Sequence, residues 1–266
     1  MRIKGRQRLR HRSWGALRER RGRGIFLLPA LLTTANLFCG FFAMVLTAQQ
    51  HYTEAALAIF VAMVMDVLDG RVARLMKATS QFGLEFDSLA DVVSFGVAPA
   101  FMLYAFALST LGRAAWLGGF LFVICGALRL ARFNVITGTS DRRWFVGLPI
   151  PAAAAVAASA VILLQGEELT RPLRTAIAVG TYLVALLMVS TFRYWSFKEV
   201  DFARRRPVQT LLVLVLVAML VATKHDVFLF LGFAGFALSG PVAWVLTGRH
   251  PVPAPEPAEA PGREQP

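Results

Sequence analysis

Charge is scarce in this chain. Only 17% of its 266 residues are Asp, Glu, Lys or Arg, and 56% are hydrophobic, whereas an ordinary soluble domain is roughly a quarter charged. This composition excludes a typical soluble domain. Apolar runs of about 20 residues recur instead, which is the length that a helix needs to cross a bilayer. The sequence therefore predicts a polytopic membrane protein.

Cysteine and histidine are also scarce. The two cysteines, Cys39 and Cys125, both lie inside apolar runs, which excludes a disulfide framework and a cysteine zinc site. The four histidines fall in predicted loops or helix ends, and we assign no chemistry to them: His11, His51, His225 and His250. We expect no cleavable signal peptide, because the first apolar run is long and lacks a small-residue cleavage site.

The expected fold is all-α, a membrane bundle of about eight transmembrane helices. The predicted spans are 25–47, 53–75, 84–109, 114–135, 147–165, 174–193, 208–223 and 226–247. With the N-terminus inside, 24 of the 28 Lys and Arg residues fall on the cytoplasmic side. The other side holds Arg113, Arg171, Arg174 and Lys224. Such a bias predicts that both chain ends are cytoplasmic.

The two chain ends differ from the spans in composition. Residues 1–24 hold ten Lys and Arg residues. Directly before a span, such a cluster is expected to bind anionic lipids and to fix orientation, and we prefer this to nucleic-acid binding. Residues 249–266 are rich in Pro, Ala and Glu. That composition cannot bury a core and predicts a disordered tail.

Four aspartates interrupt the apolar pattern in the stretch "DVLDGRVARLMKATSQFGLEFDSLAD", residues 66–91. At 100° per residue, one helix face carries Asp66, Asp69, Gly70, Ala73 and Arg74. A stripe of the next helix carries Gly83, Asp87, Asp91 and Ser94. A hairpin folded at the polar turn 77–81 would bring both aspartate pairs to the same depth, facing each other.

Four clustered carboxylates repel one another unless cations intervene. Arg71 and Arg74 could offset two charges, whereas two divalent ions would offset all four and match the oxygen ligands that Mg²⁺ and Mn²⁺ prefer. Two-metal sites act on phosphate oxygens, and the small residues Gly70 and Ala73 leave room for a diphosphate. A structural polar hairpin and a cation transporter are the alternatives. We disfavour transport because the aspartates lie near the predicted cytoplasmic ends of their spans, not near the midplane.

The same stretch resembles the signature of the CDP-alcohol phosphotransferases, with the form D-x₂-D-G-x₂-A-R-x₈-G-x₃-D-x₃-D. The resemblance covers about residues 25–195, a core of six spans, and leaves two additional helices in 196–248. It implies that two divalent ions bind the four aspartates: Asp66, Asp69, Asp87 and Asp91. It also implies that Asp91 is the catalytic base for the acceptor hydroxyl. Gly70, Arg74 and, more weakly, Ser80 would contact the CDP-linked donor.

Three further stretches resemble one branch of this family, the membrane-integral phosphatidylserine synthases: "TTANLFCGFFA", "CGALRLARFN" and "FVGLPIPAAAA". The implied reaction joins CDP-diacylglycerol and L-serine to give phosphatidylserine and CMP. The same chemistry on glycerol 3-phosphate, an inositol phosphate or choline is the nearest alternative. The resemblance leaves a homodimer open.

A serine carboxylate needs a cation in its pocket. Arg129 and Arg132 lie three residues apart near the cytoplasmic end of a predicted span, where they could bind a carboxylate or the diphosphate. Membrane-surface snorkelling explains them equally well. Asn36 could bind the cytidine, orient an aspartate or pack between helices. Thr33 and Thr34 are weaker candidates, and Pro149 and Pro151 are expected to shape the start of a span.

Overall fold

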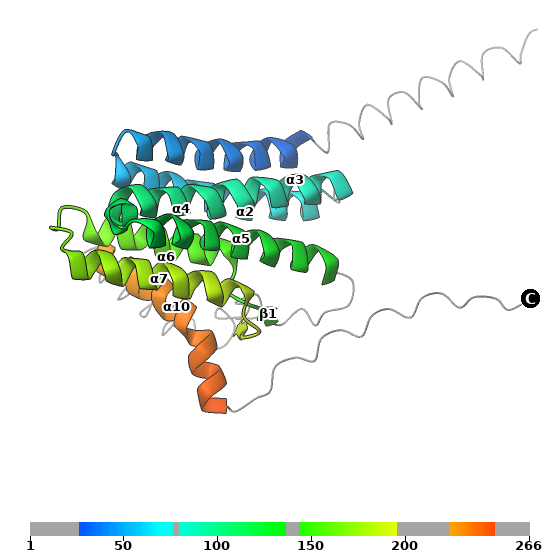
Figure 1. The fold of residues 1–266 in the computed structure, drawn as a ribbon. Coiled ribbons are helices and arrows are strands. Elements are labelled where there is room, and N and C mark those ends of the chain that lie inside the picture. Colours follow the sequence, from blue (N-terminus) through cyan, green and yellow to red (C-terminus); the bar gives the residue numbers. More distant parts are fainter. Residues whose placement is uncertain (1–26, 77–79, 137–143, 196–223, 248–266) are drawn as a thin grey trace, which may run out of the picture.

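The computed structural model describes residues 27–76, 80–136, 144–195 and 224–247. These residues form a bundle of helices that lie side by side with their long axes roughly aligned (Figure 1). The predicted basic segment 1–24, the predicted span 208–223 and the predicted tail 249–266 lie outside the described residues.

The helices begin and end close to the predicted boundaries. They are the first helix (Leu27–Ala48), α2 (Tyr52–Leu75), a long helix over Gln81–Leu111, α5 (Arg113–Ile136), α6 (Ile150–Leu164), α7 (Arg171–Val189) and α10 (His225–Thr247). Five of them are long and apolar enough to cross a membrane. Among the described helices, α2 falls outside that group, with its several charged residues, and so does α6, with only 15 residues. The helical membrane bundle is therefore confirmed, while the count of eight spans stays a prediction.

The long helix over Gln81–Leu111 changes its winding along its length. It consists of α3 (Gln81–Asp91), the π-helical η1 (Val92–Val97), α4 (Ala98–Leu103), the π-helical η2 (Tyr104–Leu108) and the 3₁₀-helical η3 (Ser109–Leu111). A π turn accommodates an extra residue and is frequent at functional sites. The first one begins directly after Asp91.

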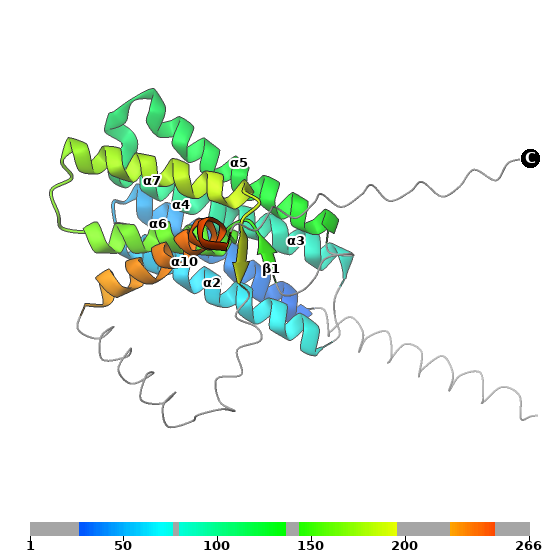
Figure 2. The same cartoon turned by 90° about the horizontal axis from the view of Figure 1, so that it is seen from below.

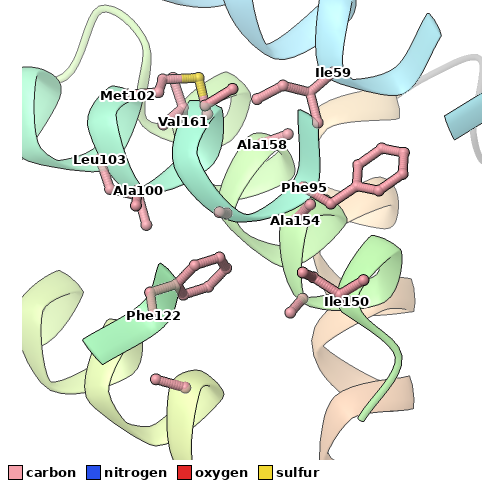
Figure 3. Packing of buried hydrophobic residues seen from close by; sticks show 14 of the residues in the cluster. Ile59, Phe95, Ala100, Met102, Leu103, Phe122, Ile150, Ala154, Ala158 and Val161 are labelled. Carbon is pink, nitrogen blue, oxygen red and sulfur yellow. The ribbon is translucent and has the colours of Figure 1, made fainter. Parts of the chain in front are cut away.

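The core is centred on α6, which packs against α2, α4, α7, α10 and η1. Its small buried residues, among them Ala154 and Ala158, let the neighbouring backbones approach closely. Larger side chains such as Phe95, Phe122 and Ile150 fill the remaining space (Figure 3). Cys39 and Cys125 are both free thiols, as the sequence predicts.

A small antiparallel sheet joins the ends of two helices. β1 (Trp144–Val146) pairs with β2 (Arg193–Trp195), with Phe145 opposite Tyr194. The hydropathy pattern did not predict this sheet, and the predicted span 174–193 runs too far because α7 ends at Val189. Aromatic residues continue the apolar run past that point, so hydropathy does not distinguish the strand from the helix.

Gly147 shapes the passage from β1 into α6. Its φ is +78°, a conformation that favours glycine. A Cβ at this position would also collide with the Met188 carbonyl oxygen. The chain is tied down at the same point, because the Gly147 N–H donates to the Phe192 carbonyl at 2.9 Å and the Leu148 N–H donates to the Leu187 carbonyl at 3.0 Å. The start of α6 is thus held against the end of α7.

Candidate active site

Three of the four predicted metal ligands converge. Asp66 and Asp69 on α2 and Asp87 on α3 each offer an oxygen, and these oxygens all lie within 4.8 Å of one another. Residues 77–79 of the connecting turn lie outside the described residues. Ser80, which follows them, caps α3 by accepting a 3.0 Å hydrogen bond from the Gly83 N–H. Serine is a preferred N-cap residue because its oxygen satisfies a free helical N–H.

The first helix holds two of the aspartates by side-chain hydrogen bonds. The Thr33 hydroxyl donates to Asp69 Oδ2 at 2.9 Å, and the Asn36 amide donates to Asp91 Oδ1 at 3.0 Å. Both carboxylates are nearly closed off from solvent, with 3% and 7% exposure. The geometry matches the expectation that Asn36 orients an aspartate.

The first helix is fitted closely to η1 beside these contacts. The Ser94 hydroxyl donates to the Asn36 carbonyl oxygen at 3.0 Å. Gly40 lies against Ser94, where a Cβ would come within 2.6 Å of the Ser94 Cα. Only glycine permits this approach without displacement of one helix. Asn36 is therefore held at both its backbone and its side chain.

Asp87 and Asp91 also line a cavity of about 200 Å³ between α3, α5 and the start of α6. Its wall combines polar and apolar residues: Leu84, Asp87, Ser88, Asp91, Arg129, Leu130, Phe133, Asn134, Pro149, Ile150 and Pro151. Arg129 is the only Lys or Arg among these described lining residues. Two carboxylates and one guanidinium therefore line one space that is suited to a small molecule.

Three buried polar atoms in the described part of the chain have no hydrogen-bond partner: Asn36 Oδ1, Asp87 Oδ1 and Arg129 Nε. All three belong to this site. An unpaired buried polar atom costs about 1–3 kcal/mol, so such atoms are rare in native proteins and each calls for an explanation. The two oxygens could accept hydrogen bonds from a ligand or bind a cation, and Arg129 Nε could donate to an anionic or acceptor group.

The carboxylate cluster fits a divalent metal. Asp66, Asp69 and Asp87 supply clustered hard oxygen ligands, the donor set of Mg²⁺ and Mn²⁺. Asp87 Oδ1 is buried and unpaired, which is the state expected of a ligand oxygen. The side-chain hydrogen bonds to Asp69 and Asp91 come from neutral groups and so do not offset the negative charge of the cluster. A cation is the natural partner of such a group.

The other predicted site residues lie in different settings. Gly70 is half-buried, and a Cβ there would meet no atom within 4 Å, so the α2 surface beside Asp69 is open. Arg74, Arg132 and Thr34 are exposed. Ser80 is engaged as a helix cap. The geometry assigns none of these residues a ligand, and their roles in binding stay predictions.

One polar contact on the cavity wall was not predicted from the sequence. The Asn134 amide donates to the Ser88 hydroxyl at 3.0 Å, and both residues line the cavity. The signal was present, because Asn134 ends the same "CGALRLARFN" stretch that carries Arg129. Pro149 and Pro151 lie at the start of α6 as expected and, beyond that expectation, form part of the wall.

Comparison with known proteins identifies the family. The sequence model of the CDP-alcohol phosphatidyltransferases matches residues 26–191, which include all four aspartates. The chain belongs to this family. The match to the CDP-alcohol phosphatidyltransferases ends just before β2 and α10.

Relatives of this CDP-alcohol phosphatidyltransferase come from distant organisms. A protein of Helicobacter pylori is 38% identical over 83% of this chain and 92% of its own length. A protein of Bacillus subtilis is 36% identical over 65% of this chain and 92% of its own length. A protein of Methanocaldococcus jannaschii is 36% identical over 65% of this chain and 75% of its own length. Each of the three is named CDP-diacylglycerol–serine O-phosphatidyltransferase.

Proposed function

We propose that this membrane enzyme transfers the phosphatidyl group of CDP-diacylglycerol to L-serine and releases CMP. The names of the relatives point to this donor and this acceptor. The observation that carries the proposal is the cavity, which Arg129 lines together with Asp87 and Asp91. A guanidinium is suited to a serine carboxylate, and a nearby aspartate is suited to the serine hydroxyl.

The aspartates on α2 and α3 would bind the metal ions. Asp66, Asp69 and Asp87 would hold one of two divalent cations, Mg²⁺ or Mn²⁺, with Asp91 contributing from the cavity side. When bound, these ions supply positive charge for the donor diphosphate and for the departing phosphate oxygen. Gly70 leaves the α2 surface open for the CDP group, and Arg74 is the nearby cation proposed to contact it. Arg132, which is exposed, is a weaker candidate for the same diphosphate.

The transfer itself is a substitution at phosphorus. The serine hydroxyl oxygen forms a bond to the lipid-side phosphorus while the bond between that phosphorus and the CMP oxygen breaks. CMP leaves with the bonding electrons, and Asp91 takes the hydroxyl proton. The Asn36 amide, which donates to Asp91 Oδ1, orients the carboxylate so that its other oxygen is directed for this role.

The remaining proposals concern placement and partners. We propose that the enzyme lies in the cell membrane with its active site and both chain ends on the cytoplasmic side, because of the bias of Lys and Arg in the loops. Residues 1–24 would bind anionic lipids and not nucleic acid. A homodimer remains a hypothesis.

The charge of the cavity wall also supports one acceptor over the alternatives. A phosphorylated alcohol such as glycerol 3-phosphate carries up to two negative charges on its phosphate and would require several cations. Arg129 is the only one on the described wall, which favours the single carboxylate of serine. Choline would place a cation next to Arg129. The charge of the wall thus supports serine over both alternatives.

Purified enzyme in detergent should release CMP from CDP-diacylglycerol only when serine is the added alcohol. The same assay with glycerol 3-phosphate, inositol phosphate and choline tests the alternatives, and CMP release with one of those alone would contradict the serine proposal. Detergent removes the membrane barrier, so CMP release under these conditions excludes transport as the sole role. Asp91→Asn should abolish release while leaving the melting temperature close to that of the wild type. Near-normal turnover would remove the role of Asp91 as base.

A further inference from the structure

A hydrogen bond joins Tyr194 to α10 at a carbonyl group that lacks its usual donor within the helix. Pro241 lies inside α10, and proline has no backbone N–H to donate to the carbonyl four residues earlier. That carbonyl belongs to Ala237. The Tyr194 hydroxyl donates to the Ala237 carbonyl oxygen at 2.9 Å. The phenol thus supplies the hydrogen bond that Pro241 cannot make.

The surface of α10 is shaped to receive the phenol ring. Tyr194 is fully buried, and its ring centre lies 5.6 Å from that of Phe236. A Cβ on Gly240 would lie 2.6 Å from Tyr194 Cζ, so a side chain at that position would exclude the ring. We call Ala237, Gly240 and Pro241 the Tyr194 socket. Burial raises the pKa of Tyr194 to about 12, so the hydroxyl keeps the proton that it donates.

A short stretch of chain connects this socket to the active-site cavity. Tyr194 lies opposite Phe145 in the sheet, and β1 leads through Gly147 and Leu148 into residues 149–151. Both of those N–H groups donate to carbonyls at the end of α7 or directly after it. Pro149, Ile150 and Pro151 then form one wall of the cavity. Figures 1 and 2 both place β1 and α3 toward the same end of the bundle.

We propose that Tyr194 is a positioning residue for the acceptor alcohol. By fastening β2 to α10 it fixes β1, and through β1 it fixes the wall that faces Asp91 and Arg129. Helix α10 also packs directly on α6, so both routes to the wall start from the same helix. The inference rests on the proposed function for the identity of the acceptor. It goes beyond the family match, since Tyr194 and α10 both follow residue 191.

A double-mutant cycle on thermal unfolding tests the shared carbonyl. Tyr194→Phe leaves the Ala237 carbonyl buried without its donor and should lower the melting temperature. Pro241→Ala supplies an N–H that can donate to the same carbonyl, so Tyr194→Phe should cost clearly less in that background. Additive effects would contradict the replacement of a helical bond by the phenol. If Tyr194→Phe alone does not accumulate, the double variant should, and failure of both would equally contradict it.

Kinetics test the positioning role. Tyr194→Phe should raise the KM for serine severalfold, up to about fivefold if the worth of one ordinary hydrogen bond is fully transmitted to the wall, and should leave the KM for CDP-diacylglycerol within twofold. Tyr182→Phe is the matched control, because Tyr182 also donates to a backbone carbonyl of another helix, that of Ala114 at 2.8 Å, away from the cavity. It should leave the KM for serine unchanged. An unchanged KM for serine in Tyr194→Phe would overturn the positioning role.

Failure of this inference is distinguishable from failure of the proposed function. If the wild-type enzyme does not use serine, the kinetic comparison is made with whichever alcohol releases CMP, and the same selective rise in its KM is expected. The unfolding cycle requires no substrate. A cavity wall that is insensitive to Tyr194 with every active acceptor would refute the inference, whichever alcohol proves to be the substrate.

Discussion

Thr33 and Asn36 lie three residues apart on the first helix, and each donates to a different aspartate. At the scale of single residues, these two bonds distinguish Asp69 and Asp91 from Asp66 and Asp87. A second partner fixes a carboxylate in one orientation before the ligand binds, and metal sites depend on such support. Asp87 has the opposite character, because its buried Oδ1 remains available to a ligand.

Thr33→Val should weaken metal binding. The change keeps the shape of the side chain but removes the hydroxyl that donates to Asp69 Oδ2. We expect the Mg²⁺ or Mn²⁺ concentration for half-maximal CMP release to rise about 10- to 100-fold, as for other supporting residues of metal sites. Thr34→Val is the matched control, because the exposed Thr34 donates within its own helix, to the Ala30 carbonyl. Equal metal requirements for the two variants would contradict the supporting role of Thr33.

Arg129→Gln should raise the KM for serine. A hydrogen-bonded ionic contact is worth about 1.5–3 kcal/mol, which predicts at least a tenfold increase. Arg113→Gln, at the other end of α5, should leave the kinetics unchanged. Titrating serine and CDP-diacylglycerol separately decides the assignment. A rise confined to the KM for CDP-diacylglycerol would mean that Arg129 binds the diphosphate instead of the serine carboxylate.

Single residues were predictable from the sequence where their spacing was diagnostic. The aspartates and Gly70 occupy fixed positions in one continuous stretch, so their convergence required only helical periodicity and one turn. The contact of Thr33 with Asp69 spans 36 positions and depends on how the first helix lies on α2. Local pattern carries no such information. Ser80 shows a second limit of sequence pattern. The resemblance implies that it contacts the donor, but in the structure its hydroxyl caps α3.

At the scale of elements, η1 and the first helix form the contact that aligns the site. Gly40 permits it, and Gly40→Ala should destabilise the fold because the new Cβ collides with Ser94. Overpacking of this kind costs about 1–3 kcal/mol, which should appear as a lower melting temperature in detergent. Gly232→Ala in α10 is the control, because its Cβ would meet no atom within 4 Å. A melting temperature for Gly40→Ala at or above the wild-type value would show that η1 can shift to accommodate the added methyl group, and would contradict the close fit.

The elements themselves were predicted more completely than their irregularities. Hydrophobic runs located the described helices to within a few residues, because the length of a span is set by the bilayer. The π turns after Asp91 and the β1–β2 sheet escaped prediction. Both lie where distant segments meet: Ser94 contacts the first helix, and Phe145 pairs with Tyr194. Periodicity within one segment does not report such contacts.

At the scale of the whole molecule, removal of divalent ions should act on activity and stability together. Chelation by EDTA should abolish CMP release and lower the melting temperature, because uncompensated carboxylates repel one another and because a bound ligand stabilises the native state. Adding Mg²⁺ or Mn²⁺ should restore both. Asp66→Asn provides the control, since its melting temperature should respond less to EDTA. A wild-type melting temperature and activity that are both indifferent to EDTA would contradict a metal site at the aspartates.

The helix at the centre of the bundle, α6, is apolar but too short to cross a bilayer. The 15 residues of α6 extend over about 22 Å, less than the roughly 30 Å of bilayer hydrocarbon. Non-helical backbone at that depth is tolerated only where protein or water covers it, and Gly147 and Leu148 are buried with both N–H groups bonded. Protein thus covers the backbone before α6, and because residues 149–151 line the cavity, we expect that cavity to lie below the lipid headgroups. A soluble amino acid would then reach the cavity from the aqueous side, whereas the lipid donor would enter laterally from the bilayer leaflet.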